Sequence, residues 1–261
     1  MASPTASAST ASGSKVLPLT QTSIGQKALV AITGALLYGF AFAHAAGNLQ
    51  VFLGQEHFNE YAEMLQSMPK VVWATRIGLL AALLTHVALV VSIATKASKA
   101  RPGRYRVDAP IAKDQSILER YARQTMLLSG LIVFAYLTFH ILHLTAGVVP
   151  GLFFHRGMAF ENLVYGMRNP PVAAFYVFAN LLLGLHLFHG CTALFQTLGL
   201  KHPQWDARTK PLALALVAVI VGTNVVIPLA CLTRIAGGEL PDDPAELVIP
   251  LDEDDATALE D

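Results

Sequence analysis

Five long apolar segments dominate this chain, and they constrain its fold more than any other feature. They cover approximately Ala28–Phe52, Val71–Thr95, Thr125–Val149, Val172–Leu198 and Leu212–Ile235. About 20 helical residues cross the hydrocarbon core of a bilayer, so each segment is long enough to span a membrane once. The sequence therefore predicts an all-α integral membrane protein, a bundle of five transmembrane helices.

The composition agrees with a membrane protein and excludes several soluble classes. Hydrophobic residues make up 54% of the chain and charged residues only 14%, whereas charged residues make up about 25% of a typical globular domain. The formal net charge is zero, so the chain lacks the basic surface of a nucleic-acid-binding protein. Cys191 and Cys231 both lie in apolar segments and form no disulfide framework, zinc motif or Cys-x-x-Cys-His haem-attachment motif.

Lysine and arginine are divided unequally between the two sides of the predicted bundle, with thirteen on one side and five on the other. The thirteen are Lys15, Lys27, Lys96, Lys99, Arg101, Arg104, Arg106, Lys113, Arg120, Arg123, Lys201, Arg208 and Lys210, and the five are Lys70, Arg76, Arg156, Arg168 and Arg234. Because cytoplasmic loops carry the excess of basic residues, we expect the N-terminus in the cytoplasm. After an odd number of spans, the C-terminus lies outside.

The two ends of the chain differ in composition from the membrane domain, 23–236. The first fifteen residues are rich in Ala, Ser and Thr and lack the apolar core of a signal peptide, so we expect a disordered tail over residues 1–22. Residues 237–261 are acidic and low in aromatics, which predicts a second disordered tail. No internal repeat is evident between these tails.

Six histidines lie within the predicted spans, which hold almost no Asp or Glu. They are His44, His86, His140, His143, His186 and His189. An ionisable side chain inside a membrane is costly and usually marks a functional site. The alternative role is an interhelical hydrogen bond, worth about 0.6 kcal/mol on average. Six histidines on four of the five helices favour the functional interpretation.

Four of these histidines match in depth. His44 and His140 each lie seventeen residues after the last basic residue before their span, which places both about 26 Å from the inner boundary. His86 lies sixteen residues after Lys70, and His186 lies fifteen residues after Pro171, so these two also match in depth. Helices one and three run in the same direction, as do helices two and four, so we expect one pair toward the outer face and one toward the inner face.

Two facing imidazoles at one depth, with no carboxylate or thiolate nearby, suit a six-coordinate iron porphyrin. A catalytic iron needs an open coordination position, and two protein ligands leave none. The two predicted pairs therefore indicate electron transfer rather than catalysis at the metal.

His143 and His189 each follow another histidine by three residues and share its helix face. Each could donate a hydrogen bond to a haem propionate or to a neighbouring helix. Histidines at this spacing can also share a zinc or copper ion, which would indicate a haem-free transporter. The scarcity of intramembrane carboxylates argues against that function, and no His-Glu-x-x-His protease motif is present.

Four predicted helices carry recognisable segments: GQKALVAITGALLYGFAFAHAAGNLQVF, RIGLLAALLTHVAL, SGLIVFAYLTFHILHLTAG and FYVFANLLLGLHLFHGCTALFQTLGLKHPQW. Together, over roughly Ser23 to Ile235, they resemble the single-chain dihaem cytochrome b subunit of succinate dehydrogenases and fumarate reductases. The fourth segment is the most specific.

The resemblance implies a subunit in the cytoplasmic (inner) membrane of a bacterium. In that family five helices, embedded in membrane lipid, anchor a flavoprotein subunit with FAD and an iron–sulfur subunit on the cytoplasmic face. Electrons pass between these partners and membrane quinone, either menaquinone or ubiquinone, through two b haems. Succinate chemistry belongs to the flavoprotein.

Carried over by position, the resemblance assigns His44 and His140 as axial ligands of an outer haem b, and His86 and His186 as those of an inner haem b. His140 opens the His-x-x-His-Leu run and His186 opens the His-Leu-Phe-His-Gly run. We therefore prefer them to His143 and His189, which remain possible secondary ligands. No catalytic residue is assigned.

Other positions bear on protons and quinone. Some fumarate reductases have a proton-transferring glutamate two residues before the fourth-helix ligand, where this chain has Gly184. Glu63 is the best candidate for a proton acceptor at an outer quinone site, although a solvated loop carboxylate is an equal interpretation. Ser23 and Lys27 are weaker candidates for an inner site.

Four glycines in the predicted helices leave room for a porphyrin or for another helix. They are Gly34, Gly39, Gly130 and Gly184.

Two further functions compete with the respiratory subunit. One is a dihaem cytochrome b that exchanges electrons with quinone or ascorbate without soluble partners. The other is the haem-free transporter with histidine-lined sites. An absorbance spectrum separates the transporter from the cytochromes, and copurifying partners separate the two cytochromes.

Overall fold

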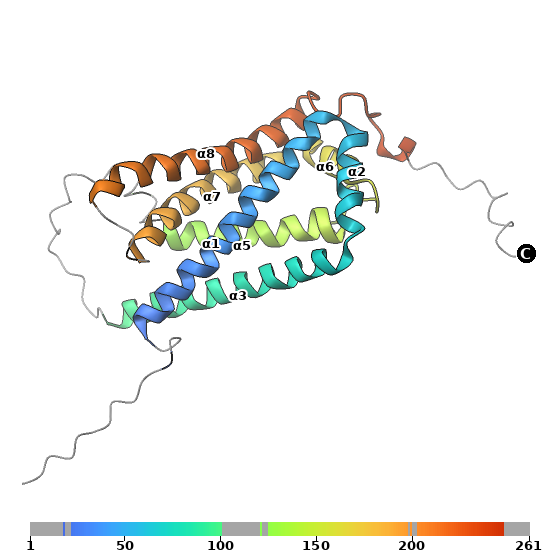
Figure 1. Cartoon of the computed structure of the whole chain (residues 1–261). Coiled ribbons are helices and arrows are strands. Elements are labelled where there is room, and N and C mark those ends of the chain that lie inside the picture. Colours follow the sequence, from blue (N-terminus) through green and yellow to red (C-terminus); the bar gives the residue numbers. More distant parts are fainter. Residues whose placement is uncertain are drawn as a thin grey trace, which may run out of the picture.

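The computed structural model describes Pro18, residues 22–100, Tyr121, residues 125–197, Gly199 and residues 203–247, with side chains from 208 onward in the last range. All regular structure within these residues is helical (Figure 1). Five helices are long and apolar enough to cross a membrane. The prediction of an all-α, five-helix membrane protein is therefore confirmed at this level.

The five long helices run back and forth along one bundle (Figure 1). They are α1 (Ser23–Asn48), continued by the 3₁₀ turn η1 (Leu49–Leu53); α3 (Pro69–Lys99); α5 (Met126–Ile141), continued by the π-helical turn η2 (Leu142–Ala146); α7 (Pro170–Thr197); and α8 (Pro203–Leu232). Successive long helices alternate in direction, so α1 begins at one end of the bundle and α8 finishes at the other. That arrangement agrees with an odd number of crossings.

Local signals set several helix boundaries. The Thr22 hydroxyl accepts a hydrogen bond from the Gly25 amide at 3.0 Å, which caps one of the free N–H groups of the first turn of α1. Pro69 occupies the first turn of α3, where its missing N–H costs nothing. Lys96 and Lys99 lie in the last turn of α3, where positive charge is favoured by the helix dipole.

Helix α8 departs from the prediction. The fifth span was expected to begin at Leu212, but the helix begins at Pro203 and contains Pro211 and Pro228. A proline deletes one helical hydrogen bond, and membrane helices tolerate this where neighbouring helices support them. Helix α8 has such support because it packs along α7 and also contacts α1 and α6.

Two shorter helices lie together at one end of the bundle (Figure 1). They are α2 (Gln55–Gln66) and α6 (Ala159–Arg168). The Phe58 and Phe160 rings meet edge to face, with centroids 6.1 Å apart. Glu63 of α2 was expected in a loop; with 12 and 10 residues, neither α2 nor α6 is long enough to span a bilayer.

A buried carboxylate joins these two helices. Glu161 of α6 is only 1% exposed, and the Gln55 side-chain amide of α2 donates to its Oε1 at 2.6 Å. The Asn59 amide donates to both Glu161 oxygens, at 3.2 and 3.0 Å, while the Asn59 oxygen accepts from the Phe160 N–H at 2.9 Å. The amide donors offset the desolvation of the carboxylate, and the network closes this end of the bundle.

Residues 237–247, part of the predicted C-terminal tail, turn back onto α6 and include the 3₁₀ helix η3 (Pro244–Leu247). The Arg168 guanidinium donates to the carbonyls of Gly237 and Pro241. The Tyr165 hydroxyl donates to the same Pro241 carbonyl at 2.8 Å, and burial raises the pKa of Tyr165, so this proton is retained. The rest of that tail, 248–261, lies outside the described residues, as does nearly all of the predicted N-terminal tail.

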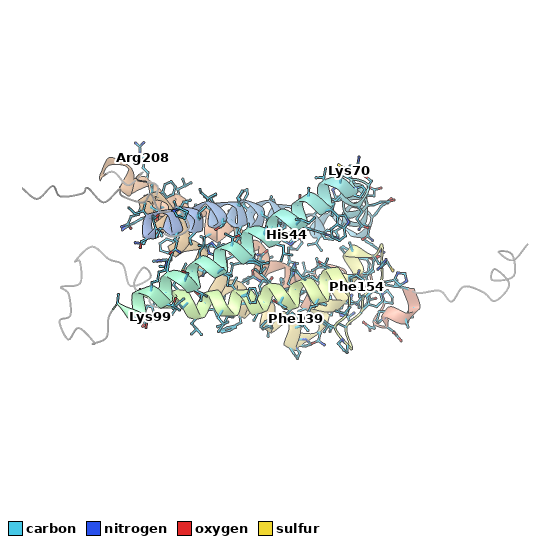
Figure 2. All side chains as sticks on the ribbon, turned by 90° about the horizontal axis from the view of Figure 1, so that it is seen from below. His44, Lys70, Lys99, Phe139, Phe154 and Arg208 are labelled. Atoms are coloured by element: carbon cyan, nitrogen blue, oxygen red, sulfur yellow. The ribbon has the colours of Figure 1, made fainter. Side chains whose placement is uncertain are left out.

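Three of the basic residues used to predict the orientation can be located in Figure 2. Figure 2 shows Lys99 and Arg208 at one end of the bundle and Lys70 at the other. Most of the basic loop between α3 and α5 lies outside the described residues. The assignment of the Lys99 end to the cytoplasm stays a prediction.

Gly184 offers a test of the packing between α7 and α8. A Cβ there would lie 2.8 Å from Val221 Cγ2, whereas a Cβ at Gly190 on the same helix would meet nothing within 4 Å. Both Gly→Ala changes gain similar helix propensity. We therefore expect Gly184→Ala to lower the free energy of unfolding by about 1–3 kcal/mol relative to Gly190→Ala, because it overpacks the interface. Detergent denaturation followed by circular dichroism measures this, and equal stabilities would contradict it.

Candidate functional site

Two histidine pairs lie inside the bundle. His44 of α1 faces His140 of α5 with ring centroids 5.8 Å apart and ring planes at 84°. His86 of α3 faces His186 of α7 with centroids 6.5 Å apart and planes at 62°. Each pair joins two parallel, non-consecutive helices. These are the partners that the depths in the sequence predicted, and the structure brings them together.

The two pairs lie at different levels of the bundle. His44 and His140 are four residues and one residue from the C-terminal ends of α1 and α5, near the end that α2 and α6 close. His86 and His186 are seventeen and sixteen residues from the beginnings of α3 and α7 at that same end, which corresponds to about 24–26 Å along the helices. The pair predicted to be the outer one, His44 and His140, and the pair predicted to be the inner one, His86 and His186, lie at these two levels.

The spacing of each pair fits two axial ligands of one metal ion. An imidazole nitrogen binds a metal at about 2 Å and lies about 1 Å from its ring centre, so two rings on opposite sides of an ion have centroids about 6 Å apart. The observed 5.8 and 6.5 Å agree with this value. Each pair supplies two neutral nitrogen donors, which is the set that a six-coordinate haem takes from its protein.

A hydroxyl group fixes the orientation of the His86 ring. The Thr33 Oγ1 donates to the Leu29 carbonyl at 2.8 Å and lies 3.2 Å from His86 Nδ1. Since the hydroxyl proton is already used within α1, the oxygen accepts from an Nδ1–H. That tautomer leaves the Nε2 lone pair of His86 free to bind a metal.

The same arrangement recurs at His186. The Ser129 Oγ donates to the Met126 carbonyl at 3.1 Å and lies 3.5 Å from His186 Nδ1. Sequence reasoning missed both Thr33 and Ser129, because a hydroxyl residue in an apolar helix is common.

Each of these hydroxyl residues precedes a glycine that lies under the same ring. A Cβ at Gly34 would approach His86 Cε1 to 3.2 Å, and a Cβ at Gly130 would approach His186 Cε1 to 3.3 Å. Of the four glycines singled out in the sequence, these two contact the histidine rings. Gly184 instead packs against α8, and a Cβ at Gly39 would meet nothing within 4 Å.

The structure thereby reveals a short internal correspondence that the sequence analysis did not find. Thr33-Gly34 precedes His44 by the same spacing with which Ser129-Gly130 precedes His140. Helix α1 thus supports the ring of α3 and contributes His44, while α5 supports the ring of α7 and contributes His140. A repeat in only three positions per helix is not visible without the contacts.

The two additional histidines have different surroundings. His143 lies in η2 and is 1% exposed; its Nδ1 is 3.1 Å from the Tyr176 hydroxyl, and its ring lies against Gly166 of α6. It is His140, not His143, whose ring lies against His44. His189 is half-buried on α7, one turn beyond His186.

The remaining candidates lie on the surface of the described chain. Glu63 is exposed on α2, and Ser23 and Lys27 are exposed in the first turns of α1. Their roles stay predictions. Glu161, the buried carboxylate beneath α2, was missed because its amide donors are about a hundred residues away in the sequence.

Comparisons of the chain with protein-family models, with curated proteins and with solved structures find no match.

If the His86/His186 pair holds a haem, Thr33→Val and Ser129→Ala should weaken its binding about 10–100-fold, because each removes a hydrogen-bond partner that orients one histidine ring. Transfer of haem from the purified protein to an excess of apomyoglobin measures the loss. Thr138→Val is the matched control, since the exposed Thr138 hydroxyl donates only to the Phe134 carbonyl of its own helix. Unchanged haem loss in both test variants would contradict the tautomer assignment.

Proposed function

We propose that this chain is the membrane-anchor cytochrome b subunit of a succinate:quinone oxidoreductase, transferring electrons between an iron–sulfur subunit and membrane quinone. The observation that carries the proposal is the presence of two facing histidine pairs, at two levels, on parallel helices of a five-helix bundle. A b haem held by such a pair takes up and releases one electron at a time.

The residues of this chain bind and orient. His44 and His140 would hold an outer haem b, and His86 and His186 an inner haem b. Thr33 and Ser129 lie beside Nδ1 of the inner rings and would keep them in the tautomer whose Nε2 is free to hold iron. Two histidines from the protein would leave a bound iron no open position for a reacting molecule, so the subunit would move electrons, and succinate chemistry would belong to a partner flavoprotein carrying FAD.

The two ends of the bundle suit different partners. The end with Lys99 and Arg208 (Figure 2) is proposed to dock the iron–sulfur subunit, close to the His86/His186 level. The opposite end, closed by α2 and α6, is proposed to exchange electrons with menaquinone or ubiquinone near the His44/His140 level. Glu63, exposed on α2, is the proposed proton acceptor there.

A stand-alone dihaem cytochrome b shares the same histidine geometry, so the difference lies in partners. Copurification of the tagged chain with a flavoprotein and an iron–sulfur protein supports the respiratory subunit. Isolation of a dihaem chain alone, with quinone or ascorbate reactivity, supports the alternative. A haem-free transporter would show no haem absorbance at all.

Two histidine pairs predict two b haems per chain, both low-spin and six-coordinate. A pyridine haemochrome assay on the purified protein, normalised to protein by amino-acid analysis, measures the ratio. One haem or none per chain would contradict the proposed function.

The assignment of ligands predicts a contrast between neighbouring histidines. His143→Leu and His189→Leu should retain both haems, while His140→Leu should lose the outer haem and His186→Leu the inner one, because the His140 ring faces His44 and the His186 ring faces His86. The same haemochrome assay with reduced-minus-oxidised spectra measures retention. Loss of a haem from His143→Leu with retention in His140→Leu would reverse the assignment on α5.

The levels of the pairs predict how electrons flow. Replacing His44 with Ala should remove the outer haem and abolish quinone-dependent turnover, while succinate oxidation with a soluble artificial acceptor survives in the assembled complex. Blue native electrophoresis checks assembly. Full quinone activity in an assembled His44→Ala complex would move the quinone site to the inner side and exclude the role of Glu63.

A further inference from the structure

Tyr176 of α7 lies between two histidines of the α5 segment, and neither Tyr176 nor His143 is used by the proposed function. Its hydroxyl is 3.4 Å from His140 Nδ1 and 3.1 Å from His143 Nδ1. Tyr176 is 4% exposed and His143 is 1% exposed. One buried phenol thus touches both an assigned iron ligand and its neighbour three residues along.

The donors and acceptors in this cluster have one consistent direction. If His140 binds iron through Nε2, its Nδ1 carries the proton and donates to the Tyr176 oxygen. The Tyr176 hydroxyl then donates to His143 Nδ1, which leaves the proton of the His143 ring on Nε2. Every polar atom of the chain from His140 through Tyr176 to His143 Nδ1 is satisfied in this direction.

The surroundings of the His143 ring support a role beyond packing. Its Nε2 is buried and has no hydrogen-bond partner among the described residues, and a Cβ at Gly166 would lie 2.5 Å from it. Burying an unpaired ring nitrogen costs free energy that an apolar side chain of similar size would avoid. The hydrogen bond between His143 Nδ1 and the Tyr176 hydroxyl is the polar contact that a histidine gains at this position.

We propose that Tyr176 and His143 are positioning residues that act on the outer haem through His140. The Tyr176 oxygen holds the His140 ring, and the hydrogen bond from Tyr176 to His143 makes that oxygen a stronger acceptor. Donation from Nδ1 to a good acceptor raises the basicity of a metal-binding imidazole, which favours ferric over ferrous iron. This inference rests on the proposed function.

The inner pair has a different second partner. The Thr33 and Ser129 hydroxyls donate hydrogen bonds to the backbone carbonyls of Leu29 and Met126 on their own helices. The Tyr176 hydroxyl, by contrast, lies against both His140 and a second ionisable side chain, His143 of η2. The two haems should therefore respond differently to changes at Tyr176.

The experiment is a potentiometric titration of the purified, haem-loaded protein, following the α band and the low-spin electron paramagnetic resonance signals of each haem. Tyr176→Phe should change the ferric/ferrous ratio of the outer haem about tenfold at a given potential, which raises its midpoint by about 59 mV for one electron. The midpoint potential of the inner haem should be unchanged.

Tyr136→Phe is the matched control. The Tyr136 ring is also close to His140, with centroids 5.9 Å apart, but its hydroxyl accepts from the Asn180 amide at 3.2 Å. It should leave both midpoints unchanged. An unchanged midpoint potential of the outer haem in Tyr176→Phe would overturn the proposal. The same midpoint shift in Tyr136→Phe as in Tyr176→Phe would overturn it too.

A second pair of variants decides the matter even where Tyr176→Phe loses its haem. His143→Leu removes the acceptor of the Tyr176 proton and should shift the outer haem in the same direction, whereas His143→Asn, whose amide oxygen can accept that proton, should restore the wild-type value. Equal midpoints in His143→Leu and wild type would overturn the inference alone. A wild-type protein without an α band would instead overturn the proposed function, and this inference with it.

Discussion

A histidine inside an apolar helix bundle needs a partner for each of its ring nitrogens, and this requirement organises the centre of the molecule. Thr33 and Ser129 satisfy the Nδ1 atoms of His86 and His186, and Tyr176 satisfies that of His140. Each partner comes from a different helix than the ring it holds. With Nδ1 paired, the Nε2 atom of each of these rings is left available as a ligand, and the ring centroids of the two pairs lie 5.8 and 6.5 Å apart.

This requirement also accounts for the way the helices pack. A ring can reach a hydroxyl on the next helix only if the two backbones come close, and Gly34 and Gly130 permit that approach beneath His86 and His186. The helix pairs α1/α3 and α5/α7 are built alike in this respect. Helix α8 stands outside the correspondence and supports α7, where Gly184 lies against Val221 and the Asn224 amide donates to Asn180 at 3.0 Å.

Particular residues show how far the sequence could be interpreted. The depths of His44, His86, His140 and His186 predicted the two pairs, because a helix rises by a constant distance per residue along its axis. The expected start of the fifth span, Leu212, is later than the observed start of α8, because Pro211 lies inside the helix and neighbouring helices support it there. The roles of Thr33, Ser129 and Tyr176 were not predictable, because each depends on a contact with a residue more than thirty positions away.

The sequence by itself determined the five membrane-crossing helices, the two levels of histidine and the uneven distribution of basic charge, because these follow from hydropathy and from a constant rise per residue. Only the tertiary structure decided which side chain lies against each ring nitrogen Nδ1, and that Glu161 and 237–247 close one end of the bundle. Rise along a helix is a local property of the chain. Rotation about the helix axis and the choice of neighbouring helix emerge only when side chains from distant segments pack together.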